Sequence, residues 1–157
     1  MIRIGHGYDV HAFGGEKPLI LGGVVFKDHR GLIAHSDGDV LVHAVCDALL
    51  GAAALRDIGF HFPDTDKQFA NVNSLELLKQ VFFLLQSRKI KINNLDLTVI
   101  AQTPKMSKHI ETIIENICQV LLIENSQCNV KATTTEQLGY IGREEGIAVH
   151  CVCLIEC

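Results

Sequence analysis

The chain has 157 residues, a length that fits one compact domain over residues 1–157. Its 14 Lys and Arg against 18 Asp and Glu give a net charge of −4, and hydrophobic residues make up 48% of the sequence. This composition argues against intrinsic disorder, and the mild acidity gives no overall electrostatic footprint for nucleic acid, which leaves only a local basic patch open. The apolar stretches are too short or interrupted for a membrane span. Without an export or transit signal at the N-terminus, we expect a cytoplasmic protein that binds neither nucleic acid nor membrane.

Hydrophobic periodicity divides the sequence into strands and helices. In chain order it predicts strands at residues 2–7 and 18–25, a helix over 40–55, a loop over 56–73, a helix over 74–88, a strand at 95–99, a helix over 107–123, and strands at 130–134 and 147–155. Ser36 with Asp39 three residues later is typical of a helix start, and Ser74 is the expected cap of the second helix. The order favours a two-layer α+β sandwich, with helices on one face of a mostly antiparallel sheet.

The six cysteines lack the dense spacing of a disulfide framework. Cys151, Cys153 and Cys157 could be read as a metal cluster. Because Cys151 and Cys153 recur at strand period within an apolar run, we expect them instead to be small buried side chains.

Polar residues in the first third of the chain point to a metal site. In an extended chain residues i and i+2 point the same way, so Asp9 and His11 would converge. The spacing i, i+4, i+8 stacks Asp39, His43 and Asp47 on one side of an otherwise apolar helix. Together, Asp9, His11 and His43 offer one oxygen and two nitrogens, a zinc set with a fourth position open. Asp39 or Asp47 would then orient the His43 ring; a surface Asp9 and a solvated helix face are the alternatives.

A run of threonines leaves the predicted strand at 130–134. Thr133, Thr134 and Thr135 offer hydroxyl and backbone N–H groups that suit phosphate oxygens. Glu136 adds a hard oxygen ligand suited to Mg²⁺ or Mn²⁺ beside phosphates. The alternative is that threonine simply favours strands.

Two more stretches suit an anionic ligand. Residues 101–106 end a strand in a proline-bearing turn, where Lys105 could contact phosphate and backbone groups could read a base edge. Arg143 is a reasonable anion clamp, although a surface ion pair with Glu144 or Glu145 would also explain it.

Taken together, these motifs resemble one family over nearly the whole chain, and their order and spacing make the resemblance specific. The sequence is similar to the 2-C-methyl-D-erythritol 2,4-cyclodiphosphate synthases at Gly5-His6-Gly7-Tyr8-Asp9-Val10-His11, at His35-Ser36-Asp37-Gly38-Asp39 with His43, at Asp57-Ile58-Gly59, at Phe62-Pro63-Asp64-Thr65-Asp66, and at Ala132-Thr133-Thr134-Thr135-Glu136.

The resemblance implies an enzyme of the non-mevalonate isoprenoid pathway in the bacterial cytoplasm. Such an enzyme is a cyclising lyase, in which the 2-phosphate of 4-diphosphocytidyl-2-C-methyl-D-erythritol 2-phosphate attacks the β-phosphorus. The products are the cyclic diphosphate and CMP. The family fold is ferredoxin-like, and it assembles as a homotrimer with each active site between neighbouring subunits.

The resemblance also implies residue roles. Asp9, His11 and His43 would hold Zn²⁺, one ion per subunit. His35 and Thr134 would stabilise the transition state, and Glu136 would help hold a second ion, Mg²⁺ or Mn²⁺. The substrate-binding positions carried over are Ser36, Asp57, Ile58, Gly59, Phe62, Pro63, Asp64, Thr65, Asp66, Ala101, Gln102, Thr103, Pro104, Lys105, Met106, Ser107, Thr133, Thr135, Tyr140 and Arg143.

Two tyrosines depart from the family pattern. Tyr8 and Tyr140 stand where phenylalanine is common, and each hydroxyl needs water or a partner. In the family, position 8 lies near a cavity along the trimer axis that can hold isoprenoid diphosphates, with Arg143 facing the diphosphate.

Two other functions stay open at this point. A zinc-dependent phosphoesterase would share the metal and phosphate features but use water as nucleophile. A non-catalytic trimer that binds isoprenoid diphosphates would have a closed metal site, with a fourth protein ligand such as His35 or His61.

Overall fold

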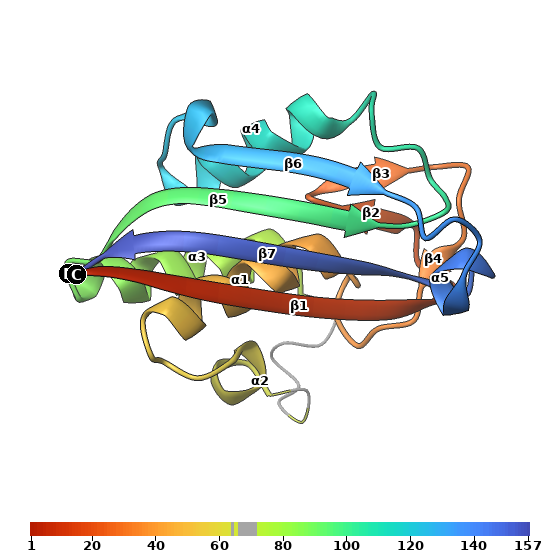
Figure 1. The fold of residues 1–157 in the computed structure, drawn as a ribbon. Helices are drawn as coiled ribbons and strands as arrows, with labels where there is room; N and C mark the ends of the chain where they lie inside the picture. The colour runs from red at the N-terminus through yellow and green to blue at the C-terminus, as the bar shows by residue number, and fades with distance from the viewer. Residues whose placement is uncertain (64, 66–71) are drawn as a thin grey trace.

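The computed structural model of the chain describes residues 1–63, 65 and 72–157 (Figure 1). Its elements, in chain order, are β1 (Ile2–Gly15), β2 (Leu19–Leu21), β3 (Val24–Phe26), β4 (Gly31–Leu32), α1 (Val40–Ala52), α2 (Ile58–His61), α3 (Ser74–Ser87), β5 (Lys91–Ile100), α4 (Ile110–Leu121), the 3₁₀ helix η2 (Asn125–Gln127), β6 (Cys128–Thr133), α5 (Gly139–Gly142) and β7 (Gly146–Glu156).

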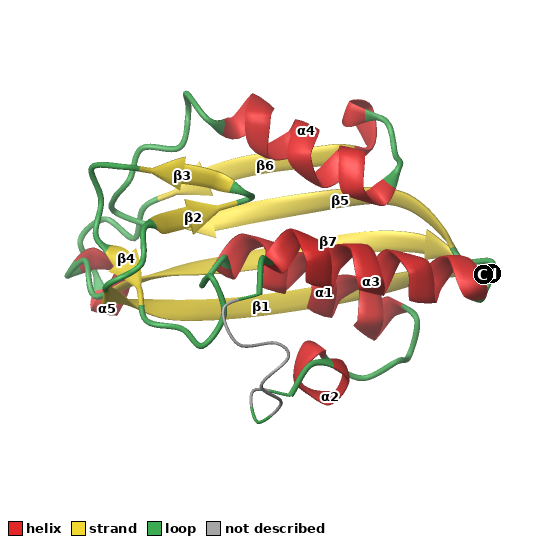
Figure 2. Cartoon of the chain, turned by 180° about the vertical axis from the view of Figure 1, so that it is seen from behind, coloured by secondary structure: helices red, strands yellow, loops and turns green. Residues whose placement is uncertain are grey.

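Five strands form one sheet in the order β4-β1-β7-β5-β6. β7 pairs antiparallel with both β1 and β5, β4 pairs antiparallel with β1, and β5 pairs parallel with β6. The helices α1, α3 and α4 all lie on one face of this sheet (Figure 2). The predicted α+β sandwich, with helices on one side of a mostly antiparallel sheet, is therefore confirmed. Within the described ranges, no helix is both long and apolar enough to cross a membrane.

The N-terminal strands differ from the prediction. β1 continues to Gly15, eight residues beyond the predicted end, because it pairs with β7 along most of its length. The strand predicted at 18–25 is a hairpin, β2 and β3, that turns at Gly22 and Gly23 with φ of 58° and 75°. Glycine adopts these positive φ angles without steric cost, so the pair marks a turn inside an apolar run.

The helix boundaries also need correction. α1 ends at Ala52 rather than at residue 55, and the nearby Ala54 adopts a left-handed φ of 57°. The cap of α3 is Asn73, whose side-chain oxygen accepts the N–H of Leu75 at 2.9 Å, and not Ser74. The predicted loop at 56–73 contains the short helix α2, and the prediction missed β4 and α5 because both are very short.

The core explains where the polar residues of α1 point. Of its 13 residues, only His43, Asp47 and Gly51 are not buried, so the predicted polar stripe is confirmed for His43 and Asp47, whereas Asp39 caps the helix and is fully buried. α1 packs directly on β1 at Gly5 and Gly7, where a Cβ atom would lie about 2 Å from a carbonyl oxygen of α1. This close packing sets the distance between α1 and the rest of β1. The prediction that Cys151 and Cys153 are buried in β7 is also confirmed.

Candidate metal centre and active site

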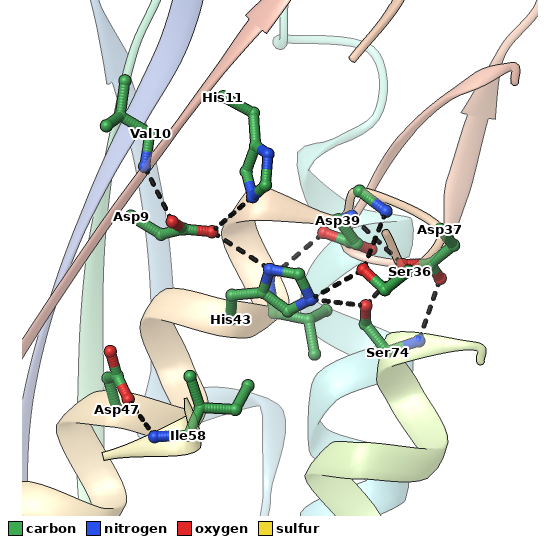
Figure 3. Close-up of polar contacts among 12 residues, drawn as sticks. Asp9, Val10, His11, Ser36, Asp37, Asp39, His43, Asp47, Ile58 and Ser74 are labelled. Atoms are coloured by element: carbon green, nitrogen blue, oxygen red, sulfur yellow. Dashed lines mark hydrogen bonds and ion pairs between the residues drawn. The ribbon is translucent and has the colours of Figure 1, made fainter. Parts of the chain in front are cut away.

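β1 supplies the first two residues of the site by strand alternation. Gly5 and Gly7 face α1, and Asp9 and His11 continue the same side of the strand. His43 is the fourth residue of α1. Since the glycines allow α1 to lie against β1, the carboxylate and both imidazoles meet at the helix–strand boundary (Figure 3).

The three side chains have the geometry of a metal site. Asp9 Oδ2 lies 3.0 Å from His43 Nδ1 and 3.1 Å from His11 Nε2, and one ligand atom from each residue lies within 4.8 Å of the others. Ligands 2.0–2.1 Å from one tetrahedral zinc ion are themselves about 3.3 Å apart. The two distances from Asp9 Oδ2 are close to this value, so the arrangement is consistent with a divalent metal ion held by these three side chains. It is the one such group of three or more in the part of the chain that the structure describes.

The Asp9 carboxyl has a perturbed acidity. Burial raises its pKa, but hydrogen bonds from His11 and His43 and the charges of the two rings outweigh burial and bring the pKa down to about 2. Asp9 is therefore a carboxylate at neutral pH, as a metal ligand must be.

Hydrogen bonds orient both imidazole rings. His11 Nδ1–H donates to the carbonyl oxygen of Ile33 at 2.8 Å, which leaves Nε2 as the coordinating atom. On the other ring, Nε2 of His43 lies 2.9 Å from Ser74 Oγ and 3.3 Å from Ser36 Oγ (Figure 3). Metal-binding histidines commonly have such a partner on the second ring nitrogen.

The expectation that Asp39 or Asp47 orients the His43 ring is wrong. Asp39 is fully buried and caps α1: its carboxylate accepts N–H groups of Val42, Gly22 and Gly23 at 2.8–3.1 Å. Burial still raises its pKa to about 6. Asp47 accepts the N–H of Ile58 at 2.7 Å, and burial raises its pKa as well. These carboxylates hold α1 to the β2–β3 turn and to α2.

A cavity of about 450 Å³ opens beside the three candidate ligands. It is lined by Asp9, His11, Ile33, Ala34, His35, Ser36, His43, Ile58, Gly59, Phe62, Val72 and Leu77. Five further candidate positions therefore line the same cavity as the candidate ligands: the exposed His35, and Ser36, Ile58, Gly59 and Phe62.

The other candidates near α2 contribute differently. Asp57 caps α2, with its carboxylate accepting the N–H of Phe60 at 2.9 Å. Pro63 and Thr65 are exposed, and the candidates Asp64 and Asp66 lie outside the described residues. His61, the suggested extra metal ligand, instead donates from Nε2 to the carbonyl oxygen of Leu55 at 2.8 Å.

The second group of candidates gathers where the parallel strands β5 and β6 end. The N–H of Ala101 donates to Thr133 O, and the N–H of Thr135 donates to Gln102 Oε1, each at 3.0 Å, so residues 101–107 and 133–136 lie together. Thr134 Oγ1 donates to Glu136 Oε1 at 3.2 Å. Residues from this group are missing from the described lining of the 450 Å³ cavity, and β7 lies between β1 and β5 in the sheet. Among the residues that the structure describes, the two groups therefore stay separate within one chain.

Tyr8, Tyr140 and Arg143 lie at the opposite face of the sheet and at its end. The hydroxyls of Tyr8 and Tyr140 are hydrogen-bonded to each other at 3.0 Å, a contact that with burial raises the pKa of Tyr8 to about 12. Arg143 makes a two-pronged ion pair with Glu145, at 2.7 Å and 3.4 Å. Within one chain, Arg143 therefore forms a surface ion pair with Glu145, which is one of the two interpretations that the sequence leaves open.

This fold and this site define a member of the YgbB family: the family model matches residues 2–156, and the chain belongs to that family. A curated relative from Idiomarina loihiensis is named 2-C-methyl-D-erythritol 2,4-cyclodiphosphate synthase. It is 57% identical over 155 residues, which cover 99% of this chain and 98% of the relative. The resemblance read from the sequence is confirmed.

Solved structures agree with the family. A Plasmodium falciparum IspF, described as a CDP complex, superposes with a TM-score of 0.86 at 40% identity, covering 98% of this chain and 95% of that one. The bifunctional IspDF from Campylobacter jejuni gives a TM-score of 0.95 at 48% identity over 99% of this chain. The chain spans 42% of that bifunctional protein.

Proposed function

We propose that this chain converts 4-diphosphocytidyl-2-C-methyl-D-erythritol 2-phosphate into 2-C-methyl-D-erythritol 2,4-cyclodiphosphate and CMP. The observation that carries the proposal is the Asp9-His11-His43 group on the wall of a 450 Å³ cavity, in a chain of this family. The relatives named as this synthase support the reaction, and the IspF structure described as a CDP complex supports a cytidine diphosphate ligand.

The reaction needs the protein to position the substrate and to neutralise its charge, and it needs no protein nucleophile. An oxygen of the 2-phosphate forms a bond to the β-phosphorus, and the bond from that phosphorus to the α-phosphate oxygen breaks, so that CMP leaves with the electron pair. Both reacting groups belong to one molecule. The protein must therefore fold a flexible polyanion into line and stabilise its negative charge.

The three candidate ligands would hold Zn²⁺ and leave one coordination position open for a phosphate oxygen. The bound ion would supply a Lewis acid beside the reacting phosphates. Asp9 supplies the anionic ligand, and Ile33 and Ser74 hold the two rings in place. His35, exposed at the same cavity, would donate to the charge that develops in the transition state.

The ends of β5 and β6 would bind the other part of the substrate. Backbone groups of 101–107 and 133–136 would hold the cytidine and its phosphates, and Thr134 would donate to the transition state. Glu136 would help hold Mg²⁺ or Mn²⁺, which would supply positive charge beside the phosphates. Its carboxylate is exposed, and the hydroxyl of Thr134 contacts it.

We extend the proposal to a homotrimer with active sites between subunits. Two observations support it: β7 separates the two candidate groups within one chain, and the helix-free sheet face exposes large apolar side chains. These side chains are Ile2, Ile4, Tyr8 and Val10 of β1, and Val152 and Leu154 of β7. An axial cavity of that trimer would bind an isoprenoid diphosphate if Arg143 exchanged Glu145 for the diphosphate.

³¹P NMR of the purified protein with substrate, zinc and Mg²⁺ tests the reaction. Two coupled upfield diphosphate signals that grow together with CMP are the expected result. Inorganic phosphate would instead indicate the phosphoesterase reaction, and an unchanged spectrum from metal-loaded protein would indicate a binding protein. Either of these results would overturn the proposed cyclisation.

A further inference from the structure

A buried serine, Ser74, and an aspartate, Asp37, lie behind the His43 ring and take no part in the proposed reaction beyond the contact of Ser74 with that ring. Ser74, at the start of α3, is fully buried, and its Oγ lies 2.9 Å from His43 Nε2. The same hydroxyl contacts Asp37 Oδ1, and the N–H of Ser74 donates to Asp37 Oδ2 at 2.9 Å (Figure 3). The order of contacts is therefore Asp37, Ser74, His43, Asp9.

The chemistry of these groups fixes the direction of each hydrogen bond. A carboxylate only accepts, so the hydroxyl proton of Ser74 goes to Asp37. Ser74 Oγ is then left to accept, and the proton between it and His43 must belong to Nε2. A neutral ring that carries its proton on Nε2 presents its lone pair at Nδ1. Nδ1 is the atom that lies 3.0 Å from Asp9 Oδ2, so a metal ion held by both would take the place of the proton that joins them in the metal-free chain.

The pair is itself held in place by backbone contacts. Besides both groups of Ser74, the Asp37 carboxylate accepts the N–H of Asp39 at 3.1 Å, and the N–H of Asp37 donates to Val72 O at 3.3 Å. Ser36 Oγ is farther from the ring, at 3.3 Å, and also accepts the N–H of Gly38. Ser74 is therefore the better-placed partner of His43.

We propose that Ser74 and Asp37 are positioning residues that select the Nε2–H tautomer of His43 and hold its ring for metal binding. The inference rests on the proposed metal site. Removing the hydrogen-bonding partner of a metal-binding histidine typically costs 10- to 100-fold in metal affinity. The loss here would appear in zinc affinity, whether or not the enzyme turns over.

The test measures zinc affinity of the full chain by competition with a chromophoric chelator. Ser74→Ala removes the hydroxyl but keeps the N–H that bonds to Asp37, and it should weaken zinc binding 10- to 100-fold. Ser74→Thr restores a hydroxyl and should recover much of the affinity. In zinc-loaded protein, the His43 Nε2–H signal in ¹⁵N NMR should be protected from solvent exchange in the wild type and exchange faster in Ser74→Ala.

Two control variants on the same helix separate positioning from stability. Asn73→Ala removes the cap of α3, and Ser87→Ala removes the hydroxyl that bonds to Leu84 O at the other end. Asn73→Ala should lower the melting temperature, and both variants should keep wild-type zinc affinity. If Ser74→Ala does not fold, the same measurement is made on Asp37→Asn, because this change removes the anionic acceptor of the Ser74 hydroxyl.

The possible results distinguish the two proposals. Zinc affinity equal to wild type in a folded Ser74→Ala or Asp37→Asn variant overturns the positioning role alone. Equal losses in Asn73→Ala and Ser74→Ala would also overturn it, since the effect would then come from the helix start. A wild-type protein that binds zinc no better than His43→Ala would overturn the metal site on which the inference rests.

Discussion

Gly7 of β1 faces the carbonyl oxygen of Ala44 in α1 so closely that a Cβ atom on Gly7 would lie 1.9 Å from that oxygen. A contact this short involves backbone, so a larger residue must push the helix away from the strand. Asp9 follows Gly7 on the same side of β1, and His43 precedes Ala44 in α1. The distance between Asp9 and His43 therefore depends on how closely α1 packs against Gly7.

Gly7→Ala should therefore lower both stability and zinc affinity. Overpacking typically costs about 1–3 kcal/mol, and displacement of α1 would move His43 away from Asp9. Urea unfolding and zinc competition measure the two effects. Gly51→Ala is the matched control: it lies on α1 with nothing within 4 Å of its added Cβ, and it should stabilise the protein by about 0.5–1 kcal/mol. Normal zinc affinity in Gly7→Ala would contradict the geometric link.

His43→Ala should abolish tight zinc binding and nearly all turnover while the protein stays folded. The change removes one of three candidate ligands, and the remaining Asp9 and His11 cannot complete the set. Zinc content by atomic absorption, turnover by CMP release and folding by circular dichroism check the three parts. His29→Ala, on a histidine that packs beside Phe26, serves as control and should keep its zinc. Full activity with full zinc occupancy in His43→Ala would contradict the assignment of His43 as a metal ligand.

Asp9 should make the metal-free protein sensitive to acid. The pKa of its carboxyl is about 2 in the folded chain against an ordinary value of 3.8, so between these two pH values the unfolded chain binds more protons. Stability therefore falls as the pH drops from about 4 to 2, by about 2 kcal/mol for this group. Urea unfolding at pH 4.5 and 2.5 should show a smaller loss for Asp9→Asn than for the wild type. Equal losses would show that Asp9 does not carry the effect.

The sequence predicts the parts of this site that depend on contacts between residues close together in the chain. Strand period brings Asp9 beside His11, and helical spacing puts His43 on the less buried side of α1, so local patterns are enough to name the candidate ligands. Their meeting depends on how α1 packs on β1, which local patterns do not show. The same helical spacing was misleading for Asp39. As the cap of α1, its side chain turns toward the N–H groups at the helix start and away from His43.

Ser74 was missed for the opposite reason. It comes 31 residues after His43, and its contact depends on how the start of α3 packs against α1. A serine before an apolar helical run reads as a cap, and the true cap, Asn73, is its neighbour. Only the motif Ser36-Asp37 hinted at polar groups near the ring, and spacing could not show that Asp37 reaches Ser74.

Glu136→Gln should weaken the dependence of turnover on Mg²⁺ or Mn²⁺ more than it changes zinc content. The amide keeps the shape of the side chain and its contact distance to Thr134 but lacks the charge that a hard divalent ion prefers. A titration of turnover against Mg²⁺, at saturating zinc, should shift to higher concentration. An unchanged titration curve would count against a second ion at Glu136.

Mixing two impaired variants should restore activity if each site lies between subunits. His43→Ala damages the metal group on β1 and α1, and Glu136→Gln damages the group at the end of β6, and β7 separates these groups in one chain. In randomly mixed trimers with equal amounts of each chain, about one quarter of the sites combine an intact metal group with an intact Glu136. Co-refolded chains should therefore recover up to about a quarter of wild-type CMP release, at a Mg²⁺ concentration where neither variant alone turns over.

Two variants damaged in the same group, His43→Ala and His11→Ala, should recover nothing when mixed. Absence of recovery in the first mixture, with trimers verified by light scattering, would place the whole site in one chain and reject the shared arrangement.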